Sequence, residues 1–96
     1  MIEGAPGKST WMVYIAQASD GTFYTGITVD VERRMREHNQ VDSKSAKYLR
    51  TRRPVKLVYS EAASSQGEAM KRERAIKKLP RERKELLISG EKETEK

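Results

Sequence analysis

Five side chains in this 96-residue chain have types that together suit the hydrolysis of a phosphodiester bond. They are two phenols, one guanidinium, one imidazole and one carboxylate, and they belong to Tyr14, Tyr24, Arg34, His38 and Glu73. Such a reaction needs a base for water, a cation for the charge that develops on the phosphate, and a carboxylate for a divalent metal. These residues form a site only if the fold brings them together.

The two tyrosines lie on two short β-rich segments, 11–18 and 22–28, which are separated by a polar turn. A two-residue Asp20-Gly21 loop would pair position 17 with position 24 and would place the phenols on opposite faces. A three-residue loop, Ser19-Asp20-Gly21, pairs 16 with 24 and 14 with 26, so that both phenols share one face. We favour the three-residue loop, because its third position requires a left-handed conformation and Gly21 stands there.

The guanidinium and the imidazole share one face of a helix that we expect over 31–39, with Asp30 as its N-cap. Positions 31, 34, 35 and 38 follow the spacing i, i+3, i+4, i+7, so Arg34 and His38 lie on the inward stripe. Polar groups beside a core need partners, because their burial is otherwise costly.

The carboxylate lies on the apolar stripe of a later helix, expected from 66 to about 79 and opened by the capping-box sequence Ser65-Gln66-Gly67-Glu68. Pro80 then begins a last helix, 81–88.

Taken singly, each of the five candidate site residues has an ordinary explanation, such as a half-buried strand aromatic, an ion pair or a histidine near a helix C-terminus. Their convergence on inward stripes and on one hairpin face favours a site.

The segment from 40 to 54 is basic, and no acidic residue lies between Asp42 and Glu61. One interpretation is a solvated run of charge. The other is a surface that follows a phosphate backbone, with one aromatic ring able to stack on a base. A helical turn can form over 45–50, and a third strand is expected over 55–59. The candidate nucleic-acid-binding residues are Lys44, Lys47, Tyr48, Arg50, Arg52 and Arg53.

Composition narrows the class of protein. The net charge of +6 favours a polyanionic partner, nucleic acid first. The chain has no cysteine and one histidine, which excludes disulfides and the usual zinc sites. No apolar run approaches membrane-spanning length and no signal peptide is evident, so we expect a cytoplasmic location, no membrane and no partner protein.

The chain is long enough for one domain. We expect a flexible leader over 1–10, a single domain over 11–88 and a flexible charged tail over 89–96. The fold class is α+β with the order β-β-α-β-α-α. A three-stranded sheet, mixed or antiparallel, is flanked by helices. In the third strand we expect Val55, Leu57 and Tyr59 to share one face, because they alternate with Lys56 and Val58.

The motifs resemble those of the GIY-YIG nuclease family. Val13-Tyr14-Ile15 and Tyr24-Thr25-Gly26 match its paired tyrosine hairpin, Arg34 follows Tyr24 by ten residues, and His38 follows Arg34 by four. Glu73 matches the family's glutamate on a later helix. The resemblance covers about 11–88. The segments around Tyr24, over 46–50 and over 53–59 are most similar to the small stand-alone bacterial branch, the UPF0213-type proteins.

The resemblance implies a metal-dependent endonuclease that acts on DNA rather than RNA, with structure selectivity or weak sequence specificity. One Mg²⁺ or Mn²⁺ would be held mainly by Glu73. Tyr14 with His38 would help to deprotonate the attacking water, Tyr24 would orient it, and Arg34 would stabilise the added negative charge.

Two departures from the family pattern leave alternatives open. Met12 stands where the first motif has its leading glycine, and Glu85 stands near the place where many active members have an asparagine. A non-catalytic nucleic-acid-binding module that keeps the fold is therefore the alternative function. A third hypothesis is an interaction domain whose basic surface binds an acidic protein.

Overall fold

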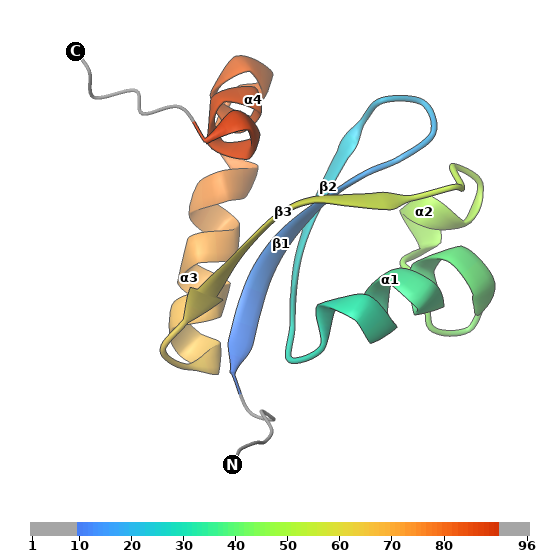
Figure 1. The fold of residues 1–96 in the computed structure, drawn as a ribbon, viewed down its shortest axis with the longest axis horizontal. Helices are drawn as coiled ribbons and strands as arrows, with labels where there is room; N and C mark the ends of the chain where they lie inside the picture. The colour runs from blue at the N-terminus through green and yellow to red at the C-terminus, as the bar shows by residue number, and fades with distance from the viewer. Residues whose placement is uncertain (1–9, 91–96) are drawn as a thin grey trace.

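The computed structural model describes residues 10–90, which form a three-stranded sheet covered by helices on both faces (Figure 1). Most of the predicted leader (1–9) and most of the predicted tail (91–96) lie outside the described residues. The elements are β1 (Trp11–Gln17), β2 (Phe23–Thr28), α1 (Val31–Gln40), α2 (Lys47–Arg50), β3 (Lys56–Ala63), α3 (Gln66–Lys77) and α4 (Arg81–Ser89).

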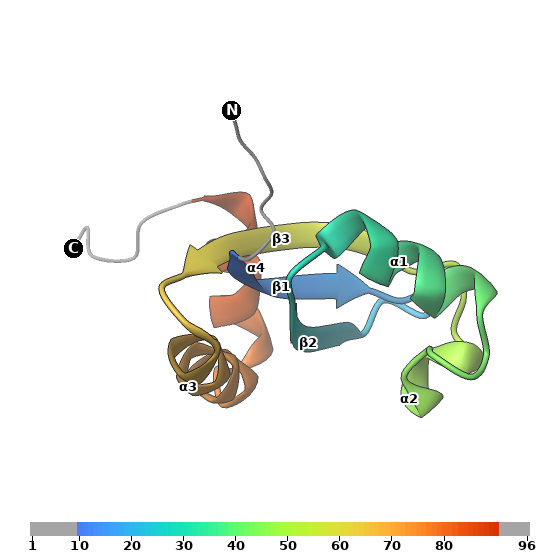
Figure 2. The same ribbon diagram turned by 90° about the horizontal axis from the view of Figure 1, so that it is seen from below.

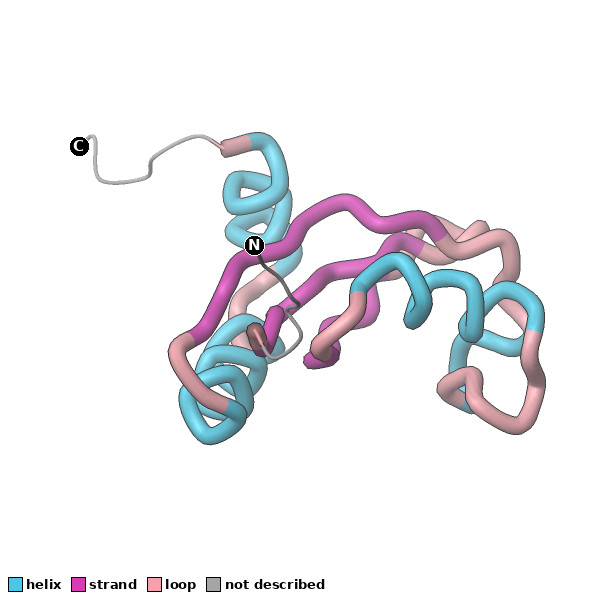
Figure 3. Tube along the Cα trace, turned by 60° about the horizontal axis from the view of Figure 1, so that its bottom comes forward, coloured by secondary structure: helices cyan, strands magenta, loops and turns pink. Residues whose placement is uncertain are grey.

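The predicted α+β class is confirmed. The strand order is β2-β1-β3 and both pairs are antiparallel, which decides between the two sheet types expected. The short helix α2 occupies the segment in which a helical turn was expected, between two stretches of loop (Figure 3). Helix α4 ends one residue later than predicted, at Ser89, and Gly90 caps it in a left-handed conformation.

The hairpin has the predicted three-residue turn. Ala16 pairs with Tyr24 and Tyr14 pairs with Gly26, so both phenols project from the same face. Gly21 has a φ of 88°, the left-handed value that the third loop position requires. The Asp20 carboxylate accepts hydrogen bonds from the backbone and the hydroxyl of Thr22, which stabilises the turn.

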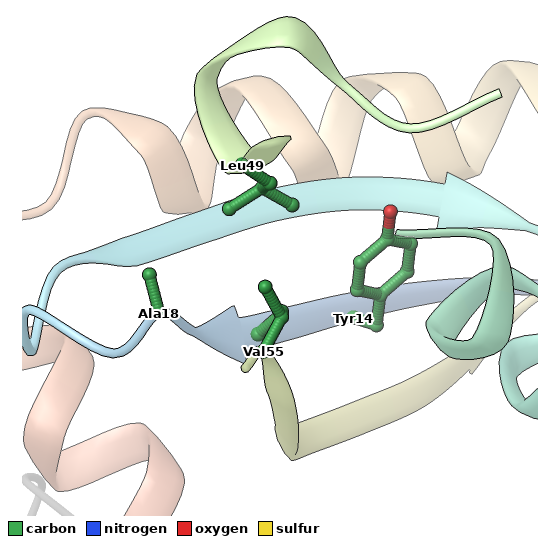
Figure 4. Packing of buried hydrophobic residues seen from close by; sticks show 5 residues of the cluster. Tyr14, Ala18, Leu49 and Val55 are labelled. Carbon is green, nitrogen blue, oxygen red and sulfur yellow. The ribbon is translucent and has the colours of Figure 1, made fainter. Parts of the chain in front are cut away.

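Alternating side chains of β1 enter two separate cores. Tyr14, Ala16 and Ala18 face the α1–α2 side, where Leu49 and Val55 pack against them (Figure 4). The intervening Val13 and Ile15 face α3, where they pack against Ala69 and Ile76. Figure 2 shows α1 and α3 on opposite sides of the sheet. The central strand thus carries both cores, which is why its middle residues are fully buried.

The third strand departs from prediction in length and in facing. It runs from Lys56 to Ala63 rather than from 55 to 59, because β1 needs a partner along its whole length. A register shift makes Ile15 pair with Tyr59 and Ala16 with Leu57, which leaves Val58 as the extra residue. Val55 and Tyr59 therefore enter opposite cores, and Leu57 is exposed. The expected single-sided alternation of Val55, Leu57 and Tyr59 was wrong.

An asparagine side chain joins the end of α1 to the start of β3. The Asn39 amide nitrogen donates to the Val55 carbonyl at 2.8 Å and to the Met35 carbonyl at 3.1 Å. The Asn39 carbonyl oxygen accepts the Val55 N–H at 2.7 Å. One side chain therefore satisfies three backbone groups where α1 and β3 meet the segment between them, residues 41–55, which we call the connector.

We expect Asn39→Ala to lower the free energy of unfolding by about 1–3 kcal/mol, since both backbone groups of Val55 lose their partner. Urea unfolding followed by circular dichroism measures the change. Gln40→Ala, at the exposed neighbouring position, is the matched control and is expected to change it by less than about 0.5 kcal/mol. Equal losses in the two variants would contradict the bridging role.

Candidate active site

Three of the predicted site residues are in direct contact on the α1–α2 side of the sheet. The Tyr14 hydroxyl and the His38 Nε2 atom lie 2.9 Å apart in a buried hydrogen bond. The Tyr24 ring meets the His38 ring edge-on, with centroids 5.5 Å apart, and the two tyrosine rings have centroids 6.4 Å apart. The hairpin supplies both phenols and α1 supplies the imidazole, as the inward stripe of that helix predicted.

The hydrogen bonds of His38 define its tautomer. The Ala46 N–H donates to Nδ1 at 3.3 Å, so Nδ1 carries no proton. Burial, with the positive charges of Arg34 and Arg53 adding to it, lowers the pKa of His38 to about 4, so the ring is neutral at pH 7. The single ring proton is therefore on Nε2, and Nε2–H donates to the Tyr14 oxygen.

The connector after α1 fixes His38 through hydrogen bonds to its backbone carbonyl and its ring. Ser45 Oγ donates to the His38 carbonyl at 3.2 Å, and Arg53 Nε donates to the same carbonyl at 2.6 Å. Together with the Ala46 amide on the ring, three connector groups restrain one residue. Ser45 is buried, although nothing in its sequence context marked it as part of a site.

Gly26 makes room for the Tyr14 ring. A Cβ atom at this position would lie 2.6 Å from the Tyr14 hydroxyl oxygen and 2.8 Å from Cζ, closer than real Cβ atoms approach. Gly26 has no positive φ, so the requirement is one of space rather than of backbone conformation. The glycine of the Tyr24-Thr25-Gly26 motif thereby allows β2 to pass under the phenol.

The phenol itself is strongly shielded from water. Burial raises the pKa of Tyr14 to about 12, with smaller contributions in the same direction from Tyr24 and Glu73. The positive charge of Arg34 opposes this shift. The pKa therefore places both Arg34 and Glu73 within electrostatic reach of the Tyr14 oxygen.

Arg34 occupies the predicted inward stripe of α1. Its Nη1 atom donates to the Lys44 carbonyl at 2.6 Å and to the Glu37 carboxylate at 3.0 Å. Its side chain is 26% exposed, so the guanidinium borders both the buried tyrosine and solvent. A cation in this position can meet a phosphate that approaches Tyr14.

Glu73 lies on the stripe of α3 that also carries Ala69 and Ile76, as predicted, and its side chain is 22% exposed. Its nearest charged partner is Lys77, whose Nζ lies 3.2 Å from Oε2. Glu73 is near enough to raise the pKa of Tyr14. Within residues 10–90, no hydrogen bond or ion pair joins it to Tyr24, Arg34 or His38.

The donor set around Glu73 suits a shared cation rather than a closed metal cage. In the part of the chain that the structure describes, no group of three or more His, Cys, Asp or Glu side chains lies together. Mg²⁺ is commonly bound by one or two carboxylates, with waters and substrate phosphate oxygens completing its shell. A single, partly buried carboxylate within electrostatic reach of Tyr14 fits that mode of binding.

Comparison with known proteins identifies the family. The sequence-family model of the GIY-YIG catalytic domain matches residues 10–85 of this chain. The chain belongs to the GIY-YIG nuclease family. Its relatives are UPF0213 proteins: one from Desulfotalea psychrophila is 51% identical over 83 residues, which are 86% of this chain and 74% of the relative. Another, from Halobacterium salinarum, is 53% identical over 76 residues, which are 79% of this chain and 96% of the relative.

A solved structure agrees with this assignment. The solution NMR structure of a UPF0213 protein from Bacillus halodurans is 44% identical, covers 84% of each chain, and superposes with a TM-score of 0.53. The family is one of nucleases, which generally use divalent metals and act on nucleic acids.

No helix within residues 10–90 combines the length and the apolarity that crossing a membrane requires.

The predicted nucleic-acid-binding residues of this GIY-YIG domain divide into two groups. The first group makes contacts within the molecule. Arg52 Nε pairs with Asp20 at 3.1 Å, and the Arg52 guanidinium stacks on the Tyr48 ring at 3.9 Å. The Tyr48 hydroxyl donates to the Thr22 hydroxyl at 2.7 Å. Arg53 donates to His38 and pairs with Asp42 at 2.9 Å. These contacts tie the connector to the hairpin turn and to α1. The remaining cations, all exposed, are Lys44, Lys47 and Arg50.

Glu85, which stands near the place where the resemblance led us to expect an asparagine, is an exposed carboxylate. Glu85 lies on α4, and its side chain is 54% exposed and pairs with Arg81 at 2.9 Å. Sequence reasoning noticed this departure. It missed Gly26, Ser45 and Lys77 as parts of the site. Two of the three had a local signal: Gly26 stands in the Tyr24-Thr25-Gly26 motif, and Lys77 stands four residues after Glu73 on the same helix.

We expect Gly26→Ala to lower the free energy of unfolding by about 1–3 kcal/mol, because the new methyl group must displace the buried Tyr14 ring. Urea unfolding measures this. Gly67→Ala is the control, since its Cβ would meet only Ser65 Oγ at 3.8 Å within α3. It is expected to be neutral or to stabilise by up to about 1 kcal/mol. A neutral Gly26→Ala would contradict the packing requirement.

His38 predicts a pH dependence of stability. Its pKa is about 4 when folded and near 6.5 when unfolded, so the unfolded chain binds more protons between these values. The free energy of unfolding should therefore fall by about 2 kcal/mol between pH 7 and pH 5 through this group. Urea unfolding across that range measures the slope. His38→Asn should lack this component, and an unchanged slope in the variant would overturn the assignment.

Proposed function

We propose that this GIY-YIG domain is a divalent-metal-dependent endonuclease that hydrolyses phosphodiester bonds in DNA, with structure selectivity or weak sequence specificity. The observation that carries the proposal is the buried hydrogen bond from His38 Nε2 to the Tyr14 hydroxyl, beside Tyr24. An imidazole that donates to a tyrosine oxygen, with a guanidinium nearby, is an arrangement that stabilises a phenolate. A purely structural tyrosine needs no such surroundings.

In the proposed reaction Tyr14 first releases its phenolic proton to solvent, and the resulting phenolate accepts the proton of the attacking water. His38 holds the Tyr14 oxygen as a hydrogen-bond donor throughout, since its Nδ1 is occupied by the Ala46 amide. This assigns His38 the role of positioning Tyr14 rather than that of taking a proton itself. Arg34 stabilises the charge of the phenolate and the charge that develops on the phosphate, and Tyr24 orients the water.

The resting state of Tyr14 is the neutral phenol, because its pKa of about 12 lies far above neutral pH. Glu73 would hold a divalent cation whose positive charge, together with that of Arg34, would favour the phenolate form of Tyr14. A bound divalent cation supplies positive charge to the phosphate and to the nucleophile. Glu73 is the residue proposed to hold it, with waters and a phosphate oxygen as its other ligands.

The proposed surface for the polymer backbone is the exposed part of the connector. Lys44, Lys47 and Arg50 present cations there, and the net charge of +6 attracts a polyanion. We place Arg52 and Arg53 in the support of the site rather than on this surface, because their guanidinium groups have intramolecular partners. No arrangement that reads base edges is evident among these residues, which supports weak sequence specificity.

A second candidate function is a non-catalytic nucleic-acid-binding module. Two observations favour it. The Tyr14 pKa is raised rather than lowered. Glu85 pairs with Arg81 near the place where the resemblance led us to expect an asparagine. The two functions share the basic connector and differ only in whether phosphodiester bonds break.

The discriminating experiment incubates labelled single-stranded, duplex and branched DNA, and matching RNA, with and without Mg²⁺ or Mn²⁺. We expect metal-dependent cleavage of DNA that Glu73→Gln reduces by about 10³-fold or more, with nucleic-acid affinity kept within a few-fold. Glu68→Gln, an exposed carboxylate on the same helix, is the control and should cleave like the wild type.

The outcomes separate the candidates. Cleavage that Glu73→Gln leaves intact would sink the assignment of this carboxylate. Binding that weakens steeply with salt, without cleavage of any substrate, would select the non-catalytic module. Preferential cleavage of RNA would replace the proposed polymer while keeping the chemistry.

A further inference from the structure

The candidate metal ligand already has a cation beside it. Glu73 and Lys77 are one helical turn apart on α3, and Lys77 Nζ lies 3.2 Å from Glu73 Oε2. The two side chains differ in environment: that of Glu73 is 22% exposed and that of Lys77 is 54% exposed. The pair therefore joins a partly buried acceptor to a donor that reaches it from solvent.

This pair differs from the other ion pair that joins two residues of α3. Lys71 and Glu68 are 3.6 Å apart, and both side chains are more than half exposed. Glu73 instead lies on the inward stripe with Ala69 and Ile76, and its charge acts on the buried Tyr14. A carboxylate that is partly withdrawn from water favours a counter-ion more strongly than one that is fully solvated. Lys77 supplies that counter-ion.

Lysine suits a counter-ion that must be exchanged. Its ammonium group is a single hydrated charge on a flexible stem, and it holds a carboxylate without the bidentate geometry of arginine. An exposed or half-exposed pair contributes little to stability, so its separation costs little. A divalent cation on the same oxygen atoms would repel an ammonium group a few ångströms away. Glu73 therefore cannot keep Lys77 and hold a divalent cation in the same place.

We propose that Lys77 is the resident counter-ion of Glu73 and competes with the divalent cation for this carboxylate. The proposal rests on the proposed function, since it takes Glu73 as the metal ligand. In the free protein Lys77 neutralises Glu73, and on cation binding its ammonium group leaves the carboxylate for solvent. Lys77 is thus a positioning residue that sets the cation affinity of the site and does not itself take part in the reaction.

The test is a titration of the full chain with Mn²⁺, in which the signal of free Mn²⁺ is followed by electron paramagnetic resonance. Lys77→Met removes the competing charge and keeps the length of the side chain. It is expected to tighten Mn²⁺ binding about two- to tenfold. Lys78→Met is the matched control, because it removes the same charge from the next, exposed position. Equal affinities in Lys77→Met and Lys78→Met would overturn the proposal.

Glu73→Gln separates this proposal from the function on which it rests. If Glu73→Gln binds Mn²⁺ as the wild type does, the metal site at Glu73 is wrong and the role of Lys77 falls with it. If Glu73→Gln loses binding while Lys77→Met matches Lys78→Met, only the competition is wrong. Tighter binding in Lys77→Met alone, together with loss in Glu73→Gln, supports both.

A second measurement observes the exchange without any change to Lys77. Titration of the ¹³C-labelled chain with Mg²⁺ should move the Cε resonance of Lys77 toward that of a free lysine. The Lys78 resonance should stay in place. A Lys77 resonance that does not move while Mg²⁺ binds at Glu73 would show that the ion pair persists, which contradicts exchange.

Discussion

The buried hydrogen bond between Tyr14 and His38 is the interaction on which the rest of the site depends. It joins the central strand to α1, and its geometry requires that β2 pass close under the phenol at Gly26. The same burial that gives the bond its strength also opposes ionisation of both partners. The site is therefore built around two groups that are neutral at pH 7.

The connector between α1 and β3 supports two other parts of the fold, and each uses one of its arginines. The buried histidine needs donors for its carbonyl and its ring, and Ser45, Ala46 and Arg53 supply them. The hairpin turn needs a partner for Asp20, and Arg52 supplies it while stacking on Tyr48. A segment that is basic in sequence thus divides its cations between internal support and solvent, and its charge alone overstates the number free for phosphate.

Glu73 is a carboxylate placed beside the core that contains Ala69 and Ile76, and its charge has a partner on the same helix. The helix stripe that brings Glu73 toward Tyr14 also withdraws it partly from water, and Lys77 compensates from the exposed side of the same helix. The pair gives the partly buried carboxylate a counter-ion in the folded chain.

The sequence by itself determined the features that depend on local geometry. Turn length and Gly21 decided the hairpin register, and helical periodicity placed Arg34, His38 and Glu73 on inward stripes. Only the tertiary structure decided the extent of β3 and its extra residue at Val58, because β1 imposes its own length and register on that strand. Distant partners likewise decided the tautomer of His38 and the internal roles of the connector arginines. Their contacts join residues far apart in the chain, and no spacing in the sequence records them.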